Sequence, residues 1–528
     1  MRDVIIIGGG HNGLVAAAFL AKAGRKPLVL ERADRVGGCA VTSEIAPGFR
    51  CPILAHRGGL DSAVVDRLGL ERHGLHIIRP AARACAPTAD GRALTVWADT
   101  AATVHDIAAF SPSDATRFPE FLASMKAVGR VVHDITTAPP PDIDKLTPRD
   151  LLGVVKAGRR FRALSKADAY RLLRWLPMSV ADLASEWFES EPLQALVAAD
   201  GVLGAFLGPR SAGSAAVSLL LSARDGHPIA PGWTARGAIG AIADALAAAA
   251  RSAGAEIRTG AEVQHILVEG GTATGVALST GEEISARDVV SNVDPRRTLM
   301  TLVDPIHLGP EFLRRVQNIR MRGTLSKVNY AVAALPDFPS LRALVPEQRA
   351  AALSGCIRLA RDTDAIERAF DAAKYGRYAE EPWIEMTIPS LGDPGLAPAG
   401  QHVVSVYVQF TPYQLRGTTW DAARDRLGEV VTRVIEQYAP GFSQSIVARQ
   451  VITPLDLERT WGLTGGHIFH GELALDQLVV ARPLLGWARY RTPIRNLYLC
   501  GAGTHPGTGI DGRSGALAAR AVLAATRK

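Results

Sequence analysis

Three glycines and one acidic residue near the start of the chain have the types and spacing needed to hold a dinucleotide. Gly8, Gly10 and Gly13 form a GxGxxG pattern directly after the apolar run Val4–Ile7. Gly8 permits a tight turn, Gly10 lets the backbone approach a pyrophosphate, and Gly13 lets a helix pack closely on a strand. Glu31 follows 18 residues beyond Gly13, where a carboxylate can accept hydrogen bonds from a ribose hydroxyl. These residues predict a dinucleotide-binding site.

The elements around this turn are those that such a site requires. The β-branched run before it predicts a buried parallel strand, residues 14–24 have helical spacing, and residues 27–31 predict a second strand. Because a carboxylate at Glu31 disfavours a 2′-phosphate, NADP is not expected, whereas NAD and FAD both remain. A second glycine doublet, Gly37-Gly38, resembles a motif of FAD enzymes in the glutathione-reductase and amine-oxidase superfamily. We therefore expect FAD, with Arg32 also at the cofactor.

A second glycine-rich junction lies almost 500 residues further on. The stretch 501–509, GAGTHPGTG, follows a strand pattern and leads into an alanine-rich helix that we expect to begin near Asp511. Loops of this kind often hold phosphate groups at a helix N-terminus. The junction is therefore either a second nucleotide site or a distant part of the first one.

Two histidines are candidates for proton transfer or substrate contact. His505 lies in the second junction, where ordering the loop beside Pro506 is the alternative role. His470 lies three residues after His467 in the stretch GHIFHGEL, so on a strand these two side chains would face opposite sides. We therefore expect no metal site, and we name His505 and His470 as candidate catalytic residues.

Composition limits the class of protein. The 528 residues are too many for one compact core, and 47% hydrophobic with 21% charged residues is an ordinary globular balance. A net charge of +7 over this length is mild, and no nucleic-acid-binding motif accompanies it. Five scattered cysteines without a CxxC pair indicate a reducing compartment. We expect a cytoplasmic protein that is soluble or peripheral to a membrane, and composition leaves homo-oligomers open.

Residues 145–176 form a basic amphipathic segment. Lysine and arginine greatly outnumber acids there, and leucine, valine and tryptophan are interleaved with them. The favoured interpretation is a solvated helical face. The alternative is a surface that rests on a membrane and admits a lipophilic substrate.

Taken together, the motifs resemble those of the phytoene-dehydrogenase-like flavoproteins over essentially the whole chain. The marks are IIGGGHNGLVAAAFLAKAG, LERADRVGGCAVTSEIAPGF, RGAIGAIADAL and NLYLCGAGTHPGTG. Within that family the stretch ITPLDLERTWGLTGGHIFHGELALDQLVVARP looks closest to the branch of the pyridine nucleotide-disulphide oxidoreductase domain-containing protein 2. That name implies a redox dithiol, which this sequence lacks. Cys39 stands where many relatives have arginine, and Thr508 where many have glycine.

The resemblance implies an α/β fold with a discontinuous Rossmann-type FAD-binding domain and an inserted, mixed α+β substrate domain. The FAD-binding domain would comprise residues 1–75, 232–300 and 455–528, and the substrate domain 76–231 and 301–454. It further implies that the second junction reaches the flavin of the same cofactor, and that its helix N-terminus stabilises the reduced ring. The cofactor-binding residues expected on this basis are Val263, Gly501, Gly503, Gly509 and Asp511.

The function implied is an FAD-dependent oxidoreductase that passes a hydride from a lipophilic, polyene-like substrate to flavin N5. Two alternatives remain open at this point. One is a protein that binds FAD for redox sensing or partner binding without turnover, and the other is a redox-neutral FAD-dependent isomerase. A plain NAD dehydrogenase would leave the second junction without a role.

Overall fold

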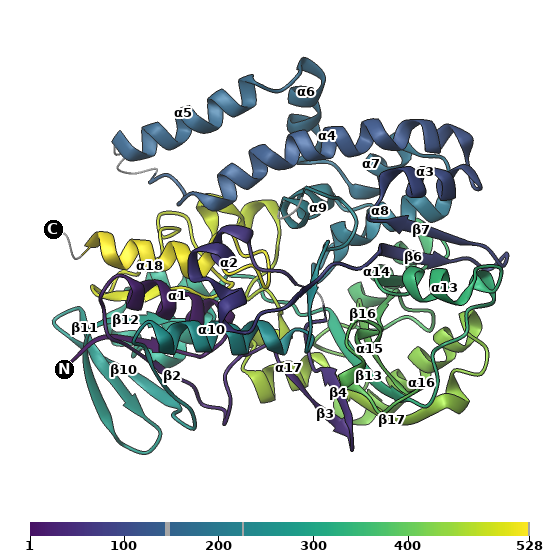
Figure 1. Ribbon diagram of the computed structural model, residues 1–528. Helices are drawn as coiled ribbons and strands as arrows, with labels where there is room; N and C mark the ends of the chain where they lie inside the picture. The colour runs from purple at the N-terminus through teal and green to yellow at the C-terminus, as the bar shows by residue number, and fades with distance from the viewer. Residues whose placement is uncertain (57, 143–147, 224–225, 526–528) are drawn as a thin grey trace.

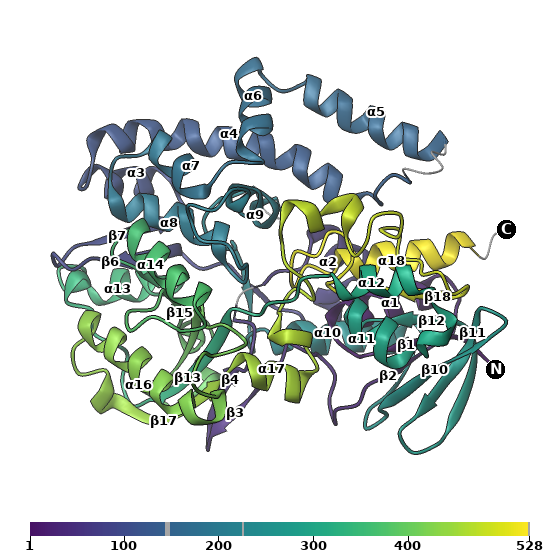
Figure 2. The same cartoon turned by 180° about the vertical axis from the view of Figure 1, so that it is seen from behind.

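The computed structural model describes residues 1–56, 58–142, 148–223 and 226–525. Two seven-stranded sheets organise the chain, and each is assembled from segments that lie far apart in the sequence. Figures 1 and 2 show the two sheets side by side, with a group of helices above the second sheet.

The first sheet has a Rossmann-type parallel core. Its central strand β1 (Arg2–Ile7) is fully buried from Val4 onward and lies between β2 (Pro27–Leu30) and β12 (Glu283–Ser291) in parallel register. Two further parallel strands, β9 (Glu256–Arg258) and β18 (Leu497–Leu499), flank these. The antiparallel strands β10 (Val263–Glu269) and β11 (Thr272–Leu278) continue the sheet from the first part of β12, whereas β18 pairs with its last part. The predicted α/β class with a Rossmann-type sheet is therefore confirmed.

Three small-residue helices cover one face of this sheet. They are α1 (His11–Lys22), α10 (Gly240–Ser252) and α18 (Arg513–Ala525), which lie together in Figure 1. The fit of α1 is very close, because a Cβ on Gly13 would lie 2.2 Å from the carbonyl oxygen of Gly8. Because Gly13 has no side chain, α1 can begin directly against the turn that precedes it.

The second sheet also joins early and late segments of the chain. Its strand order is β17-β13-β16-β15-β14-β6-β7, so strands from residues 82–97 lie beside strands from residues 325–452. The strands are β6 (Ala82–Pro87), β7 (Ala93–Trp97), β13 (Leu325–Val332), β14 (Cys356–Leu359), β15 (Ile384–Thr387), β16 (His402–Gln409) and β17 (Ile446–Ile452).

A helical layer packs over this second sheet in one aromatic-rich core. Its helices are α3 (Thr100–Ala108), α4 (Pro112–Thr137), α5 (Pro148–Arg162), α6 (Lys166–Trp175), α7 (Val180–Trp187), α8 (Glu191–Val202) and α9 (Ser214–Ser222). The predicted basic segment 145–176 thus contains the separate helices α5 and α6, and its residues 145–147 lie outside the described residues.

The remaining elements connect these layers or cover the second sheet. They are β3 (Thr42–Ala46), β4 (Phe49–Pro52), α2 (Ser62–Leu68), β5 (Ile77–Ile78), β8 (Thr234–Ala235), α11 (Pro295–Arg297), α12 (Pro310–Gln317), α13 (Pro346–Ala352), α14 (Thr363–Lys374), α15 (Pro389–Gly392), α16 (Trp420–Tyr438) and α17 (Pro454–Trp461). In the parts of the chain that the structure describes, no helix is long and apolar enough to span a membrane.

The close fit at Gly13 generates the first prediction. Gly13→Ala should lower the free energy of unfolding by about 1–3 kcal/mol, because the new methyl group meets a backbone oxygen that cannot easily move. Gly129→Ala is the matched control, since Gly129 is also helical and has open space around its Cβ position. That control should be neutral or stabilise by about 0.5–1 kcal/mol. Urea unfolding measures both variants, and equal effects would contradict the packing argument.

Candidate active site

A cavity of about 520 Å³ extends from the first sheet into the second. Polar groups and glycines line its first end, among them Gly8, Gly10, His11, Glu31, Arg32, Gly38 and Val263. Apolar side chains line much of the other end, including Leu203, Leu221, Leu325, Tyr407, Ile468 and Phe469. The cavity therefore joins a polar part lined by glycines to a part lined largely by apolar side chains.

The floor of the polar end is a close meeting of two glycine turns. Gly10 forms an isolated parallel bridge with Gly37, and a Cβ on Gly38 would lie 3.2 Å from the Cα of Gly10. A Cβ on Gly10 would lie 2.8 Å from the side-chain nitrogen of Asn292. Side chains at these glycines would fill the space between the turns, so the arrangement leaves bare backbone where a pyrophosphate could approach.

Glu31 is held in place at the cavity wall by backbone donors. Its Oε2 accepts a hydrogen bond of 2.7 Å from the N–H of Gly9, and its Oε1 accepts one of 3.0 Å from the N–H of Ala33. Arg32 also lines the cavity, and its guanidinium donates to the carbonyl of Thr460 at 2.5 Å. Val263, the first residue of β10, also lines the cavity. These positions suit the ribose and adenine end of a dinucleotide.

Asn292 connects the two distant junctions, and the sequence analysis did not identify it. Its side-chain nitrogen donates to the carbonyl of Gly8 at 3.3 Å. Its own carbonyl would lie 2.6 Å from a Cβ on Gly501, and a Cβ on Gly503 would lie 2.3 Å from Pro295. Gly501 and Gly503 thus pack on the segment after β12, while Ala502 between them lines the cavity. The second junction is therefore brought to the first one.

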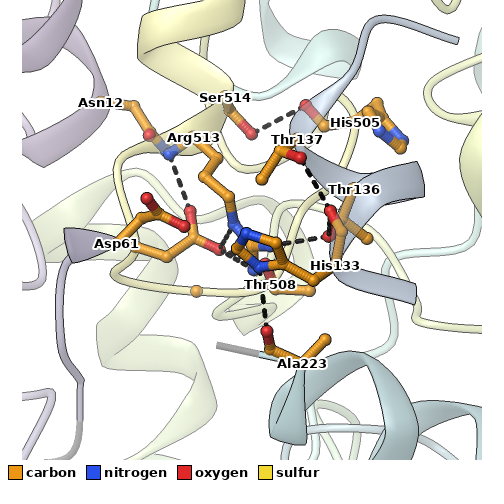
Figure 3. Close-up of polar contacts among 12 residues, drawn as sticks. Asn12, Asp61, His133, Thr136, Thr137, Ala223, His505, Thr508, Arg513 and Ser514 are labelled. Atoms are coloured by element: carbon orange, nitrogen blue, oxygen red, sulfur yellow. Dashed lines mark hydrogen bonds and ion pairs between the residues drawn. The ribbon is translucent and has the colours of Figure 1, made fainter. Parts of the chain in front are cut away.

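The end of the second junction holds a buried ion pair. Asp511 accepts hydrogen bonds from the backbone N–H and the guanidinium of Arg513, with oxygen–nitrogen distances of 2.8–3.0 Å. Figure 3 shows Arg513 reaching Thr508 and also Thr136 of α4. Burial opposes ionisation of Asp511, but the charge of Arg513 and the hydrogen bond from Thr508 lower the pKa of this carboxyl.

This ion pair bears on the expectation that the N-terminus of α18 offers free N–H groups to the reduced flavin ring. The N–H of Arg513 is bound by Asp511, and the N–H of Gly515 is bound by the side chain of Asn12 at 3.2 Å. These two groups are therefore already satisfied within the protein. Gly509 lines the cavity, whereas Asp511 is absent from its lining.

The two candidate histidines occupy different positions. The Nε2 of His505 lies 3.1 Å from the carbonyl of Ile135 in α4, and His505 does not line the cavity. His470 does line it, and its Nδ1 has no hydrogen-bond partner among the described residues. Burial is the main cause that lowers the pKa of each ring to about 4, so both are neutral at pH 7. The geometry favours His470 as the group that contacts a ligand.

Arg482 is a buried cation behind the wall that contains His470. Its guanidinium donates to backbone carbonyls, including those of Phe469 at 2.6 Å and Ala502 at 2.8 Å. Burial lowers the pKa of Arg482 to about 10, so the side chain remains charged at pH 7. Arg482 therefore ties together two loops of the wall and places a positive charge close behind them.

Two other residues in the cavity lining, Cys39 and Lys327, carry side chains that are reactive when deprotonated. Burial raises the pKa of the Cys39 thiol to about 12, which keeps it protonated and unreactive. Lys327 of β13 also lines the cavity and was not identified from sequence, although a lysine within an apolar strand is unusual. In the described part of the chain no cluster of residues could hold a metal ion.

These features fit an FAD molecule. Bare backbone at the glycine turns, the fixed acid Glu31 and the His470 side chain all line a single cavity. Two stretches of the chain match known families. Residues 6–58 match the NAD(P)-binding Rossmann-like domain, and residues 179–523 match the flavin containing amine oxidoreductase family.

Individual proteins agree with this assignment. The pyridine nucleotide-disulfide oxidoreductase domain-containing protein 2 of Rattus norvegicus is 37% identical, over 99% of this chain and 93% of its own. The lycopene-forming phytoene desaturase of Pantoea ananas is 26% identical over 99% of both chains. A solved putrescine oxidase variant covers 100% of this chain and 99% of its own with a TM-score of 0.62 at 15% identity, and so supports the fold. The chain therefore belongs to the flavin containing amine oxidoreductase family, and it is a phytoene-desaturase-like, FAD-dependent oxidoreductase.

Proposed function

We propose that this oxidoreductase dehydrogenates a lipophilic substrate, with a polyene as the candidate class, by hydride transfer to flavin N5. The observation that carries the proposal is the apolar continuation of the cavity beyond the nucleotide end. Relatives named for phytoene desaturase and limonene dehydrogenase support a substrate of this kind.

The protein's own residues would bind, orient and shield the reactants. Bound FAD supplies a two-electron acceptor. Leu203, Leu325 and Phe469 would hold the substrate in the apolar end and exclude water. The fixed charge of Arg482, behind the wall, would favour negative charge in that part of the cavity.

Anaerobic mixing with candidate substrates tests this function. The oxidised-flavin absorption should disappear when the holoprotein meets a suitable polyene or saturated precursor, with one double bond formed per flavin reduced. Leu203→Trp should slow this reduction at least tenfold because the indole fills the apolar end, while FAD remains bound. Leu475→Trp, at a residue that is 48% exposed, is the control and should leave the rate unchanged.

Two results would contradict the proposal. Substrate isomerisation with no net change in flavin oxidation state would support the isomerase instead. Retained FAD without reduction by any lipophilic compound would support the redox-sensing or partner-binding alternative.

We also propose that α5 rests on an anionic membrane surface, with the protein in a reducing compartment such as the cytoplasm. Arg160 pairs with Asp134 of α4 at 2.9 Å, and Phe161 packs against the helical core, so these residues define the inner side of α5. The opposite side carries Leu151, Leu152, Val155, Arg159 and Arg162. Leu152 is 70% exposed.

This helix therefore turns apolar side chains away from the protein. Figures 1 and 2 both show α5 at the rim of the molecule. Residues 151–167 contain five cations and no acids, so their charge complements anionic lipid headgroups.

Vesicle flotation tests the membrane contact. The holoprotein should float with phosphatidylserine-containing vesicles and remain unbound with phosphatidylcholine alone. Replacing Leu151, Leu152 and Val155 together by Asn should abolish flotation, and Arg159→Glu with Arg162→Glu should do the same. Val345→Asn is the control, since that residue is 54% exposed elsewhere. Unchanged flotation of the triple variant, or a change in its oligomeric mass instead, would contradict the proposal.

A further inference from the structure

A row of polar side chains crosses three neighbouring strands of the second sheet on one face. Asn329 of β13 lies directly opposite Ser405 of β16 and Gln450 of β17 in the strand register. Side chains of directly paired residues lie on the same face of a sheet. Asn329 and Ser405 are fully buried, whereas Gln450 is half-buried and lines the cavity. The row therefore leads from the interior of the sheet to the cavity at the edge strand β17.

The hydrogen bonds of this row fix the orientation of the Gln450 amide. Nδ2 of Asn329 donates to the backbone carbonyl of Ile53 at 3.2 Å, and because a carbonyl can only accept, this bond identifies the nitrogen of the Asn329 amide. The same Nδ2 donates to Oε1 of Gln450 at 3.0 Å. Oδ1 of Asn329 accepts from the hydroxyl of Ser405 at 3.2 Å. Gln450 therefore turns its oxygen toward Asn329, and its Nε2 is left as a donor.

This Nε2 has no hydrogen-bond partner in the ranges of the chain that the structure describes. Two other polar side chains of the lining, both on β13, differ in this respect. The hydroxyl of Ser326 bonds the hydroxyl of Thr411 at 2.9 Å, and Nζ of Lys327 lies 2.7 Å from Nδ1 of His56. Gln450 is thus a neutral donor in the lining that is not used within the described part of the protein.

The lining beside Gln450 combines an apolar wall with contact to solvent. Ile452 lies two residues further along β17 and so on the same face of the strand. It belongs to an apolar cluster that includes the lining residues Val41, Ile53, Leu54, Leu457 and Leu463. Strand β3 lies beside β17 in Figures 1 and 2, and its exposed residue Glu44 also lines the cavity. A ligand in this part of the cavity would therefore meet apolar side chains and the Gln450 amide together.

We propose that Gln450 is a specificity-determining residue that donates a hydrogen bond to an oxygen atom of the substrate. The inference rests on the proposed dehydrogenase function and narrows its substrate class. The substrate is then a lipophilic compound that carries a hydroxyl or carbonyl group, and not a plain hydrocarbon. Its apolar part would lie against the wall that contains Leu54 and Leu457, and its oxygen would meet Nε2 of Gln450.

The cost of an unpaired donor is the physical basis of this selection. A hydrocarbon that covers Gln450 displaces water from the N–H groups and leaves them without an acceptor. A substrate oxygen replaces that water and keeps the N–H groups paired. Pockets that are mostly apolar use a small number of placed polar groups in this way to fix the orientation of a ligand.

Equilibrium binding of labelled isoprenoid probes to the holoprotein tests the assignment. The probes are geraniol and geranylgeraniol, each compared with the hydrocarbon that lacks its hydroxyl group. Gln450→Met keeps the length of the side chain and removes the donor. It should lower the ratio of alcohol affinity to hydrocarbon affinity about 2–10-fold relative to the wild type, the effect expected for one hydrogen bond. Comparing ratios cancels the different hydration of the probes in water.

An unchanged ratio in Gln450→Met would overturn the proposal. This includes an equal loss of affinity for alcohol and hydrocarbon, which is the result expected if Gln450 has only a structural role. Gln414→Met is the matched control, since Gln414 is exposed and does not line the cavity, and its ratio should equal that of the wild type.

A second variant tests the direction of the hydrogen bond and serves if Gln450→Met does not fold. Gln450→Glu replaces the donor by a carboxylate, which accepts only. Geraniol can donate to this carboxylate, whereas geranyl methyl ether cannot. The ratio of ether affinity to hydrocarbon affinity should therefore fall below the wild-type value, while the ratio for geraniol should not fall. An ether ratio that stays at the wild-type value would overturn the role of Gln450 as a donor.

These measurements separate the inference from the function on which it rests, because binding needs no turnover. The expected ratios, together with a flavin that no lipophilic compound reduces, would contradict the dehydrogenase function alone. Flavin reduction with unchanged ratios would contradict the role of Gln450 alone. If none of the probes binds to the wild-type holoprotein, both the lipophilic substrate class and the role of Gln450 are wrong.

Discussion

The backbone contacts around Asn292 are the constraint on which the rest of the site depends. Three segments far apart in the chain meet there, namely the turn Gly8–Gly13, the end of β12 and the loop at Gly501. A side chain would not fit at these contacts, because a Cβ on Gly10 would lie 2.8 Å from the amide nitrogen of Asn292 and a Cβ on Gly501 would lie 2.6 Å from its carbonyl oxygen. The polar end of the cavity exists because these segments approach as bare backbone.

Buried charges around the cavity are stabilised in different ways. Arg482 is surrounded by backbone carbonyls, Asp511 pairs with Arg513, and Lys327 faces a histidine backed by Glu385. The first two arrangements keep a fixed charge and hold loops together. The third places a buried amine in the cavity lining, where a buried histidine is its hydrogen-bond partner.

Family membership and geometry answer different questions. Membership in the flavin containing amine oxidoreductase family establishes an FAD-dependent oxidoreductase. Relatives with that fold include proteins named for phytoene, limonene and putrescine, so the fold alone does not select a substrate. The apolar end of the cavity is therefore the observation from which the substrate class has to be argued.

The sequence by itself determined the elements of the first junction and the α/β class. The pattern from Val4 to Glu31 is local, so strand, turn and helix follow from neighbouring residues, and β1, α1 and β2 were predicted correctly. The roles of Gly8, Gly10, Glu31 and Val263 at the cofactor stay predictions, although all four line the cavity.

Only the tertiary structure decided which distant side chains meet. It placed His505 against α4, paired Asp511 with Arg513, and brought Lys327 to His56, which is 271 residues away. Local patterns carry no information on such contacts, because they depend on strand order and on the packing of helices over the second sheet. The two glycine-rich junctions could be read from the sequence, but the buried contact between Lys327 and His56 could not.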